Sequence, residues 1–178
     1  MQDAVQMTGI VKVYGETGLR ANDGVDLNLR AGEILCLAGE NGAGKTTLMK
    51  VLYGMERADA GIIRIDGKEV AIDSPLTANR LGIGMVHQHF MLVEDFTVAQ
   101  NVTLGKEPLR HHLAYDAKTA CTMVDEVIRN HHFSIDTRQK VASLAIGQKQ
   151  QVEIVKMLYR DVDILILDEP TAVLTEQE

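Results

Sequence analysis

The feature that most constrains this chain is a glycine-rich loop that fits the pattern G-x-x-x-x-G-K-[ST] in full. It consists of Gly39, Glu40, Asn41, Gly42, Ala43, Gly44, Lys45 and Thr46. A short apolar run at residues 34–38 comes directly before it, which predicts a strand buried on both faces. A helix is expected from Lys45 to about Tyr53, and Gly54 is placed to end it. Strand, loop and helix in this order predict an α/β fold with mostly parallel strands in its core.

The loop predicts a phosphate-binding site. Glycines let the backbone curl so that successive N–H groups point inward, and the helix that follows adds the positive end of its dipole. The amine of Lys45 can reach the β- and γ-phosphates of a nucleotide, and the hydroxyl of Thr46 can ligate Mg²⁺. The alternative is a surface turn that fits the pattern by chance, and the expected strand before it and helix after it argue against this.

A second fully apolar run, at residues 164–167, predicts another core strand, and it ends in Asp168 and Glu169. The carboxylate of Asp168 can hold a metal through a water molecule. Glu169, beside it, can orient or deprotonate an attacking water. Two solvent-facing acids at a strand end are the alternative, which the presence of the phosphate loop makes the weaker interpretation.

Between these motifs the hydrophobic pattern changes along the chain. Residues 7–34 and 62–70 alternate as strands and turns do, and residues 83–86 predict a core strand. From about residue 98 to residue 160, apolar side chains recur at helical spacing, which predicts an inserted helical subdomain. The net charge of −7 argues against a polyanionic partner, so no nucleic acid is expected. Cys36 and Cys121 both lie in apolar patterns and are expected to be small buried thiols.

Residues 144–148, Leu-Ala-Ile-Gly-Gln, resemble the LSGGQ signature of the ATP-binding cassette (ABC) ATPases. The signature lies before the acidic strand end, and the order of phosphate loop, Gln88, signature and acidic strand end covers nearly the whole chain. The resemblance implies a P-loop NTPase (RecA-like) core with an N-terminal antiparallel β subdomain and an inserted helical subdomain. Residues 1–178 are then an incomplete nucleotide-binding domain: β subdomain and phosphate-loop core at 1–87, helical subdomain at 88–160, and Walker B strand and D-loop at 161–178.

The resemblance also assigns roles to single residues. Tyr14 lies where the family has an aromatic ring that stacks on adenine, although a strand-edge tyrosine would look the same. Gln88 matches the glutamine that senses the metal and the attacking water. Glu169 and Lys45 are the other expected catalytic groups, and Thr46, Gln88 and Asp168 are the expected metal ligands. Further nucleotide contacts are expected from Thr47 and, across a cassette dimer, from Leu144, Ala145, Gly147 and Gln148. An ordinary helix N-terminus is the alternative for the signature.

The chain departs from the family pattern in four places. Ala145 replaces the signature serine, so a hydroxyl that would donate to the γ-phosphate is missing. Ile146 replaces the first signature glycine, and Thr175 stands where many relatives have the D-loop aspartate. The family's next core strand and its switch histidine do not occur before Glu178. The histidine pairs at 111–112 and 131–132 are expected to be solvated rather than to fill that role.

The resemblance implies hydrolysis of ATP with Mg²⁺, coupled to the import of a simple sugar or a nucleoside. The implied partners are a second cassette (a homodimer or a fused tandem half), membrane permease subunits near Gln88 and residues 90–94, and a solute-binding protein. The expected location is the cytoplasmic face of the cell membrane, as a peripheral protein. Two alternatives stay open: an ATP-binding fragment with little hydrolysis of its own, and a cassette ATPase acting outside transport on DNA or ribosomes.

Overall fold

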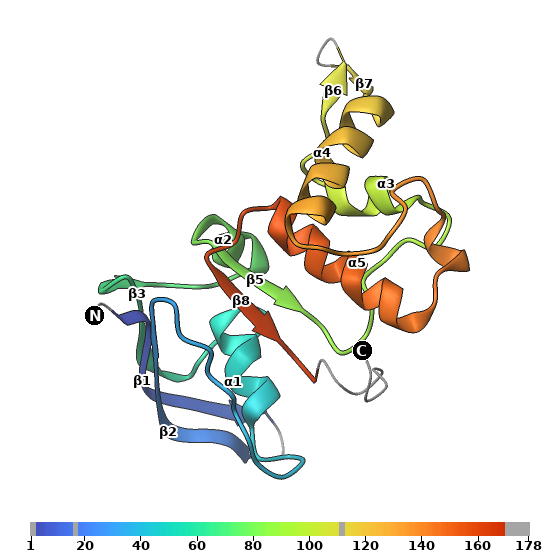
Figure 1. Cartoon of the computed structure of the whole chain (residues 1–178). Coiled ribbons are helices and arrows are strands. Elements are labelled where there is room, and N and C mark those ends of the chain that lie inside the picture. Colours follow the sequence, from blue (N-terminus) through green and yellow to red (C-terminus); the bar gives the residue numbers. More distant parts are fainter. Residues whose placement is uncertain (1–2, 16–17, 111–112, 170–178) are drawn as a thin grey trace. The chain divides into compact units, whose positions relative to one another are not determined.

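The computed structural model describes residues 3–15, 18–110 and 113–169 (Figure 1). They form two compact units, one within Met1–Gly84 and the other within Met85–Glu178. Among these described residues, no helix is long and apolar enough to cross a bilayer.

The first unit is built on an antiparallel sheet with the strand order β2-β1-β3-β4. Its strands are β1 (Asp3–Tyr14), β2 (Leu19–Arg30), β3 (Ala60–Ile65) and β4 (Lys68–Val70). Val5, Met7 and Ile10 of β1 are fully buried. The spacing lengthens by one residue after Met7 because the register shifts there, at a bulge where Gly9 has a φ of 62°. The alternating pattern predicts strands here, and the antiparallel β subdomain that the family resemblance implies is present.

Two helices complete the first unit. Helix α1 (Lys45–Leu52) starts directly after the glycine-rich loop, contacts β2, and buries Leu48, Val51 and Leu52. Gly54 follows it with a φ of 75°, as expected of a glycine that ends a helix. Helix α2 (Pro75–Arg80) is capped by Ser74, whose side chain accepts a hydrogen bond from the backbone N–H of Thr77.

The apolar run at residues 34–38 does not form the buried strand that the sequence predicts. Its backbone is irregular, and no strand among the described residues pairs with it. The side chain of Ile34 is 97% exposed, and Cys36 is exposed rather than a buried thiol. A strand exists only through hydrogen bonds to a neighbour, and an apolar pattern does not itself supply that neighbour.

The second unit contains a pair of short strands, β5 (Ile83–Val86), which crosses the boundary between the units, and β8 (Ile164–Leu167). The two arrows run in the same direction in Figure 1, and the N–H of Asp168 donates to the carbonyl of Val86 at 3.1 Å. Both strands are where the sequence predicts them. All of β5 is buried, but β8 alternates, with Leu165 and Leu167 partly exposed. In the described structure β8 is thus covered on one face, whereas its continuous apolar sequence predicts burial on both.

The remainder of the second unit is helical, as predicted. It contains α3 (Val98–Thr103), α4 (Ala117–Asn130), the 3₁₀ turn η1 (Val141–Ser143) and α5 (Ile146–Tyr159), with a short hairpin of β6 (Leu109–Arg110) and β7 (Ala114–Tyr115) that the sequence does not predict. Helices α3, α4 and α5 pack against one another. Their shared core consists of Val98, Ala99, Val102, Val124, Ile128, Val141, Leu144, Val152 and Val155. Cys121 packs against this core and is half-buried, which partly fits the buried thiol expected.

Candidate functional site

The glycine-rich loop of the first unit curls as its sequence predicts. Gly42 and Gly44 both have a φ of 84°, a left-handed conformation that residues with a side chain rarely adopt. The N–H of Ala43 donates to the carbonyl of Glu40 at 3.2 Å and closes a turn. The carbonyl of Gly44 accepts the first helical bond of α1, from Leu48 at 2.9 Å. The loop thus passes directly into a helix N-terminus, the arrangement that favours a bound anion.

Strand β2 fixes the last turn of the loop. A Cβ atom on Gly44 would lie 2.1 Å from the carbonyl oxygen of Ala21 and 2.8 Å from the amide nitrogen of Asn22. The Asn22 amide, 4% exposed, donates to the carbonyl of Gly44 at 3.2 Å. Sequence reasoning missed this residue, because Asn-Asp-Gly at 22–24 is typical of a turn and gives no sign of a contact with the loop.

The side chain of Lys45 folds back over the first residues of the glycine-rich loop. Its Nζ donates to the carbonyl of Gly39 at 2.7 Å and to that of Glu40 at 2.9 Å. The ammonium group is therefore held at the loop, where phosphate oxygens could replace the two carbonyls as its acceptors. Thr46 and Thr47 are half-buried in the first turn of α1, and Asn41 is exposed.

The second unit brings two of the predicted site residues together. The Nε2 of Gln88 donates to Oε2 of Glu169 at 2.8 Å, although the two residues are 81 positions apart in the sequence. Gln88 comes two residues after β5 and Glu169 two residues after β8, so the paired strands deliver both side chains to one edge. This is the edge at which α/β sheets bind their ligands. Asp168, between β8 and Glu169, is half-buried.

Glu169 also has an unusual backbone. Its φ is 50°, in the left-handed region that residues other than glycine seldom occupy. Such conformations cost of order 1–3 kcal/mol and gather at functional sites. The exposed carboxylate of Glu169 is therefore held by both its backbone and its bond to Gln88.

The signature segment opens α5. Leu144 is buried in the helical core, and Ala145 is the N-cap residue. The N–H of Ala145 donates to Oε1 of Gln148 at 3.1 Å, which is one half of a capping box. The other half needs a side-chain acceptor at the N-cap, and alanine has none. Gly147 is buried in the first turn, so the motif does begin a helix as expected.

Tyr14 lies at the end of β1 and is half-buried. The Nζ of Lys12 lies 5.4 Å from the centroid of its ring, a cation–π distance, and also pairs with Glu56 at 3.2 Å. Stacking of this ring on adenine stays a prediction.

His131 and His132 are exposed, in keeping with a solvated pair, while residues 111–112 and Thr175 lie outside the described residues. Where the chain is described, no three His, Cys, Asp or Glu side chains gather as metal ligands. The hydroxyl of Thr46 and the carboxylate of Asp168 are hard oxygen donors of the kind that Mg²⁺ prefers, and their ligation of it stays a prediction.

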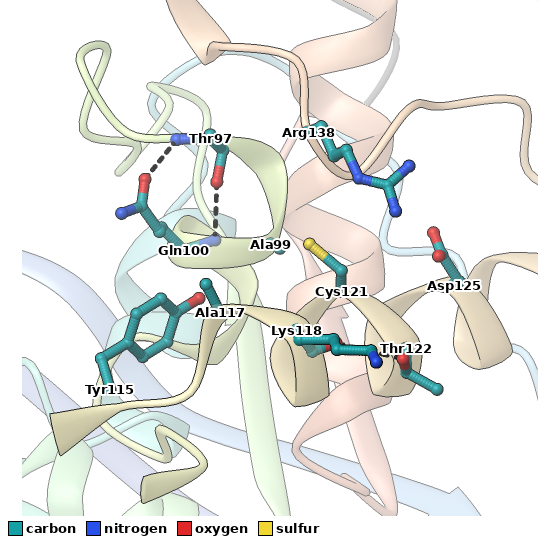
Figure 2. Close-up of a pocket in the computed structure, with 10 residues that line it drawn as sticks. All are labelled: Thr97, Ala99, Gln100, Tyr115, Ala117, Lys118, Cys121, Thr122, Asp125 and Arg138. Carbon is teal, nitrogen blue, oxygen red and sulfur yellow. Dashed lines mark hydrogen bonds between the residues drawn. The ribbon is translucent and has the colours of Figure 1, made fainter. Parts of the chain in front are cut away.

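A pocket of about 450 Å³ lies in the second unit, between α3, α4 and the loop that carries Arg138. Figure 2 shows Tyr115, Cys121, Asp125 and Arg138 around it. None of the residues expected to contact a nucleotide lines this pocket, so it is separate from the candidate site within the second unit.

Comparison with known proteins gives consistent matches. A family model described as "ABC transporter" matches residues 22–172. The guanosine import ATP-binding protein NupO of Bacillus subtilis is 49% identical over 178 residues, which are 100% of this chain and 34% of that protein. The nucleoside import ATP-binding protein NupA of Lactococcus lactis subsp. cremoris is 47% identical over 177 residues, 99% of this chain and 34% of that protein. The chain thus spans about a third of the length of these relatives.

A solved structure described as the dimeric structure of MJ0796, a bacterial ABC transporter cassette, matches with a TM-score of 0.80 and 25% identity. The match covers 97% of this chain and 77% of that one. This similarity confirms the predicted α/β class and P-loop NTPase fold.

Proposed function

The chain belongs to the ABC transporter family, and from this we propose that it binds ATP with Mg²⁺ and hydrolyses it to energise solute import. The proposal rests on the geometry of the glycine-rich loop and of the two strand ends that bear Gln88 and Glu169. The loop is curled with Lys45 held over it, and a hydrogen bond joins Gln88 to Glu169.

The loop supplies the phosphate-binding half of this function. Its two left-handed glycines and the start of α1 direct backbone N–H groups toward an anion. On binding, Lys45 exchanges its two carbonyl acceptors for β- and γ-phosphate oxygens, and it stabilises the charge that develops there. Thr46 and Asp168, the latter through a water, would hold Mg²⁺ together with Gln88. A metal held there would neutralise part of the phosphate charge.

Glu169 supplies the base. Its carboxylate, held by Gln88, accepts a proton from a water molecule as the water oxygen attacks the γ-phosphorus. The bond between that phosphorus and the oxygen bridging to the β-phosphate breaks, which releases ADP and inorganic phosphate. Gln88 keeps the carboxylate oriented, because its amide donates to one carboxylate oxygen.

Three partners follow from the family. A second cassette, as a homodimer or a fused tandem half, would place its signature on this nucleotide, and the solved MJ0796 cassette is described as dimeric. Permease subunits would carry the solute across the membrane, and a solute-binding protein would deliver it. The relatives described above are named for the import of guanosine and of nucleosides, which supports a nucleoside, one of the two expected classes of solute. The chain would then act at the cytoplasmic face of the membrane.

The test is ATP affinity and turnover, measured on the chain and on three variants. Lys45→Ala should weaken ATP binding by at least about tenfold, since hydrogen bonds to charged groups contribute about 1.5–3 kcal/mol. Glu169→Gln should keep the affinity and abolish turnover. Lys50→Ala, in the last turn of the same helix α1, is the matched control and should change neither.

Unchanged affinity in Lys45→Ala would refute the assignment of the loop. Binding without turnover by the unaltered chain would favour the alternative of an ATP-binding fragment. Purification of the parent protein with ribosomes or DNA instead of a membrane permease would favour a function outside transport.

A further inference from the structure

The backbone of Met91, three residues after Gln88, is held from both sides by charged side chains of α5. Oε1 of Glu153 accepts a hydrogen bond from the N–H of Met91 at 2.5 Å. The Nζ of Lys156 donates to the carbonyl of the same residue at 3.4 Å. The two side chains also pair with each other, at 3.6 Å.

This ion pair is unusual because it is buried. Glu153 is only 3% exposed and Lys156 only 9%. Buried charges are costly even when paired, and well-packed apolar residues often replace such pairs without loss of stability. Stability alone therefore gives little reason for two charges here, whereas a specific grip on the backbone of Met91 does.

A second pair of hydrogen bonds holds the loop that follows Gln88 two residues later, at Val93. The Asn101 side chain, 1% exposed, accepts from the N–H of Val93 at 2.7 Å and donates to its carbonyl at 3.0 Å. Leu92, between Met91 and Val93, packs against the helical core. The chain that leaves Gln88 is thus fixed to α5 at Met91 and to α3 at Val93.

The hydrogen bond from Met91 to Glu153 joins the loop that follows Gln88 to α5, the helix that begins at the signature. Glu153 lies six residues after Gly147 on α5, which is about 9 Å along a continuous helix. Met91 lies three residues after Gln88, whose amide bonds to Glu169. The path from Gln88 to the signature therefore consists of three residues of chain, the hydrogen bond between Met91 and Glu153, and one stretch of α5.

We propose that Glu153 and Lys156 are positioning residues that fasten the Gln88 loop to α5, so that movement of Gln88 on ATP binding moves the signature end of that helix. The inference rests on the proposed function, since it requires ATP to displace Gln88. Neither residue touches the nucleotide, and both act through the backbone of Met91.

The test compares variants that separate the backbone grip from the buried ion pair. Glu153→Gln keeps an oxygen that can accept from Met91 but removes the charge that faces Lys156. The double variant Glu153→Lys with Lys156→Glu keeps an ion pair but places a donor against the N–H of Met91. Glu153→Ala removes both. Lys149→Ala is the matched control, because it breaks only the contact of α5 with Glu94, which is 70% exposed.

For each variant, ATP affinity, stability against denaturant, and amide hydrogen exchange would be measured, the last with and without Mg²⁺ and ATP. In the unaltered chain, ATP should slow exchange both at residues 88–91 and at residues 146–148. We expect Glu153→Ala to speed exchange of the Met91 amide by about 10- to 100-fold and to abolish the ATP response at 146–148, with ATP affinity within about threefold. Glu153→Gln should be less stable yet keep this response, and Lys149→Ala should keep it in full.

The charge-swapped variant gives the sharpest contrast. It should lose the response at 146–148 even where its stability is restored. A full response in that variant, or in Glu153→Ala, with ATP bound would overturn this inference and leave the proposed function standing. Where the charge-swapped chain does not fold, the contrast between Glu153→Gln and Glu153→Ala decides in the same way. Absence of ATP binding by the unaltered chain would instead overturn the proposed function, and the inference with it.

Discussion

Two glycines of the phosphate loop have the same backbone φ but different surroundings, which makes them a matched pair for substitution. Gly42 and Gly44 both have a φ of 84°. A Cβ atom on Gly42 would meet nothing within 4 Å, whereas one on Gly44 would lie 2.1 Å from the carbonyl oxygen of Ala21. Alanine at either position therefore carries the same conformational strain, and only alanine at 44 collides with β2.

The expected losses of stability follow from these two terms. The left-handed conformation costs an L-residue roughly 1–2 kcal/mol, which applies to both variants. The contact at 2.1 Å is far inside the 3.4 Å at which ordinary van der Waals contact begins, and the atom it meets is backbone, so the loop or β2 must shift. Forced overpacking of this kind typically costs about 1–3 kcal/mol more. We expect Gly42→Ala to lose about 1–2 kcal/mol and Gly44→Ala about 2–5 kcal/mol.

The assay is denaturant unfolding of the three chains, together with ATP affinity. Equal slopes of unfolding free energy against denaturant would show that the variants differ in stability alone. Any gain from the stiffer unfolded chain is the same for both substitutions and cancels in the comparison. ATP binding should fall further in Gly44→Ala than in Gly42→Ala, because the first turn of α1 moves with the loop. Equal losses of stability would refute the claim that β2 fixes this end of the loop.

Two further predictions concern helix starts in the second unit. Ala145→Ser should do no harm to activity and should complete the capping box with Gln148, raising stability by about 0.5–1 kcal/mol and the melting temperature by about 1–4 °C in thermal unfolding. At the start of α4, the backbone N–H of Thr119 and, to a smaller extent, its hydroxyl donate hydrogen bonds to the Asp116 carboxyl. These bonds lower the pKa of that carboxyl below its usual 3.8. Its contribution to stability is therefore complete above pH 3.8 and is lost as the pH falls through the lower folded value. Asp116→Asn should flatten that part of an acid unfolding curve, and an unchanged curve would contradict the assignment.

Local patterns gave the most dependable predictions from sequence. The loop, the helix after it and the strand at residues 83–86 each depend on neighbours in the chain, and each is present. The contact between Gln88 and Glu169 is not itself predicted, although both residues come soon after strands that the sequence predicts.

What failed or was missed depends on partners distant in sequence. Residues 34–38 have the composition of a buried strand, but no described strand pairs with them. The amide of Asn22 and the carboxylate of Glu153 bind backbone groups 22 and 62 positions away. No periodicity in a single sequence reports a contact between a side chain and a distant backbone group. Both residues are polar and buried, a combination that only the structure reveals.

The hydrogen bonds that fix the course of the Gln88 loop at Met91 and Val93 involve the backbone of these residues and not their side chains. Met91 and Val93 are held through their N–H and carbonyl groups, while their side chains are 57% and 40% exposed. Substitution of these two side chains therefore leaves the bonds that fix the loop in place. These exposed side chains can therefore change in evolution to suit a different neighbouring protein, while the backbone of the loop after Gln88 keeps its conformation.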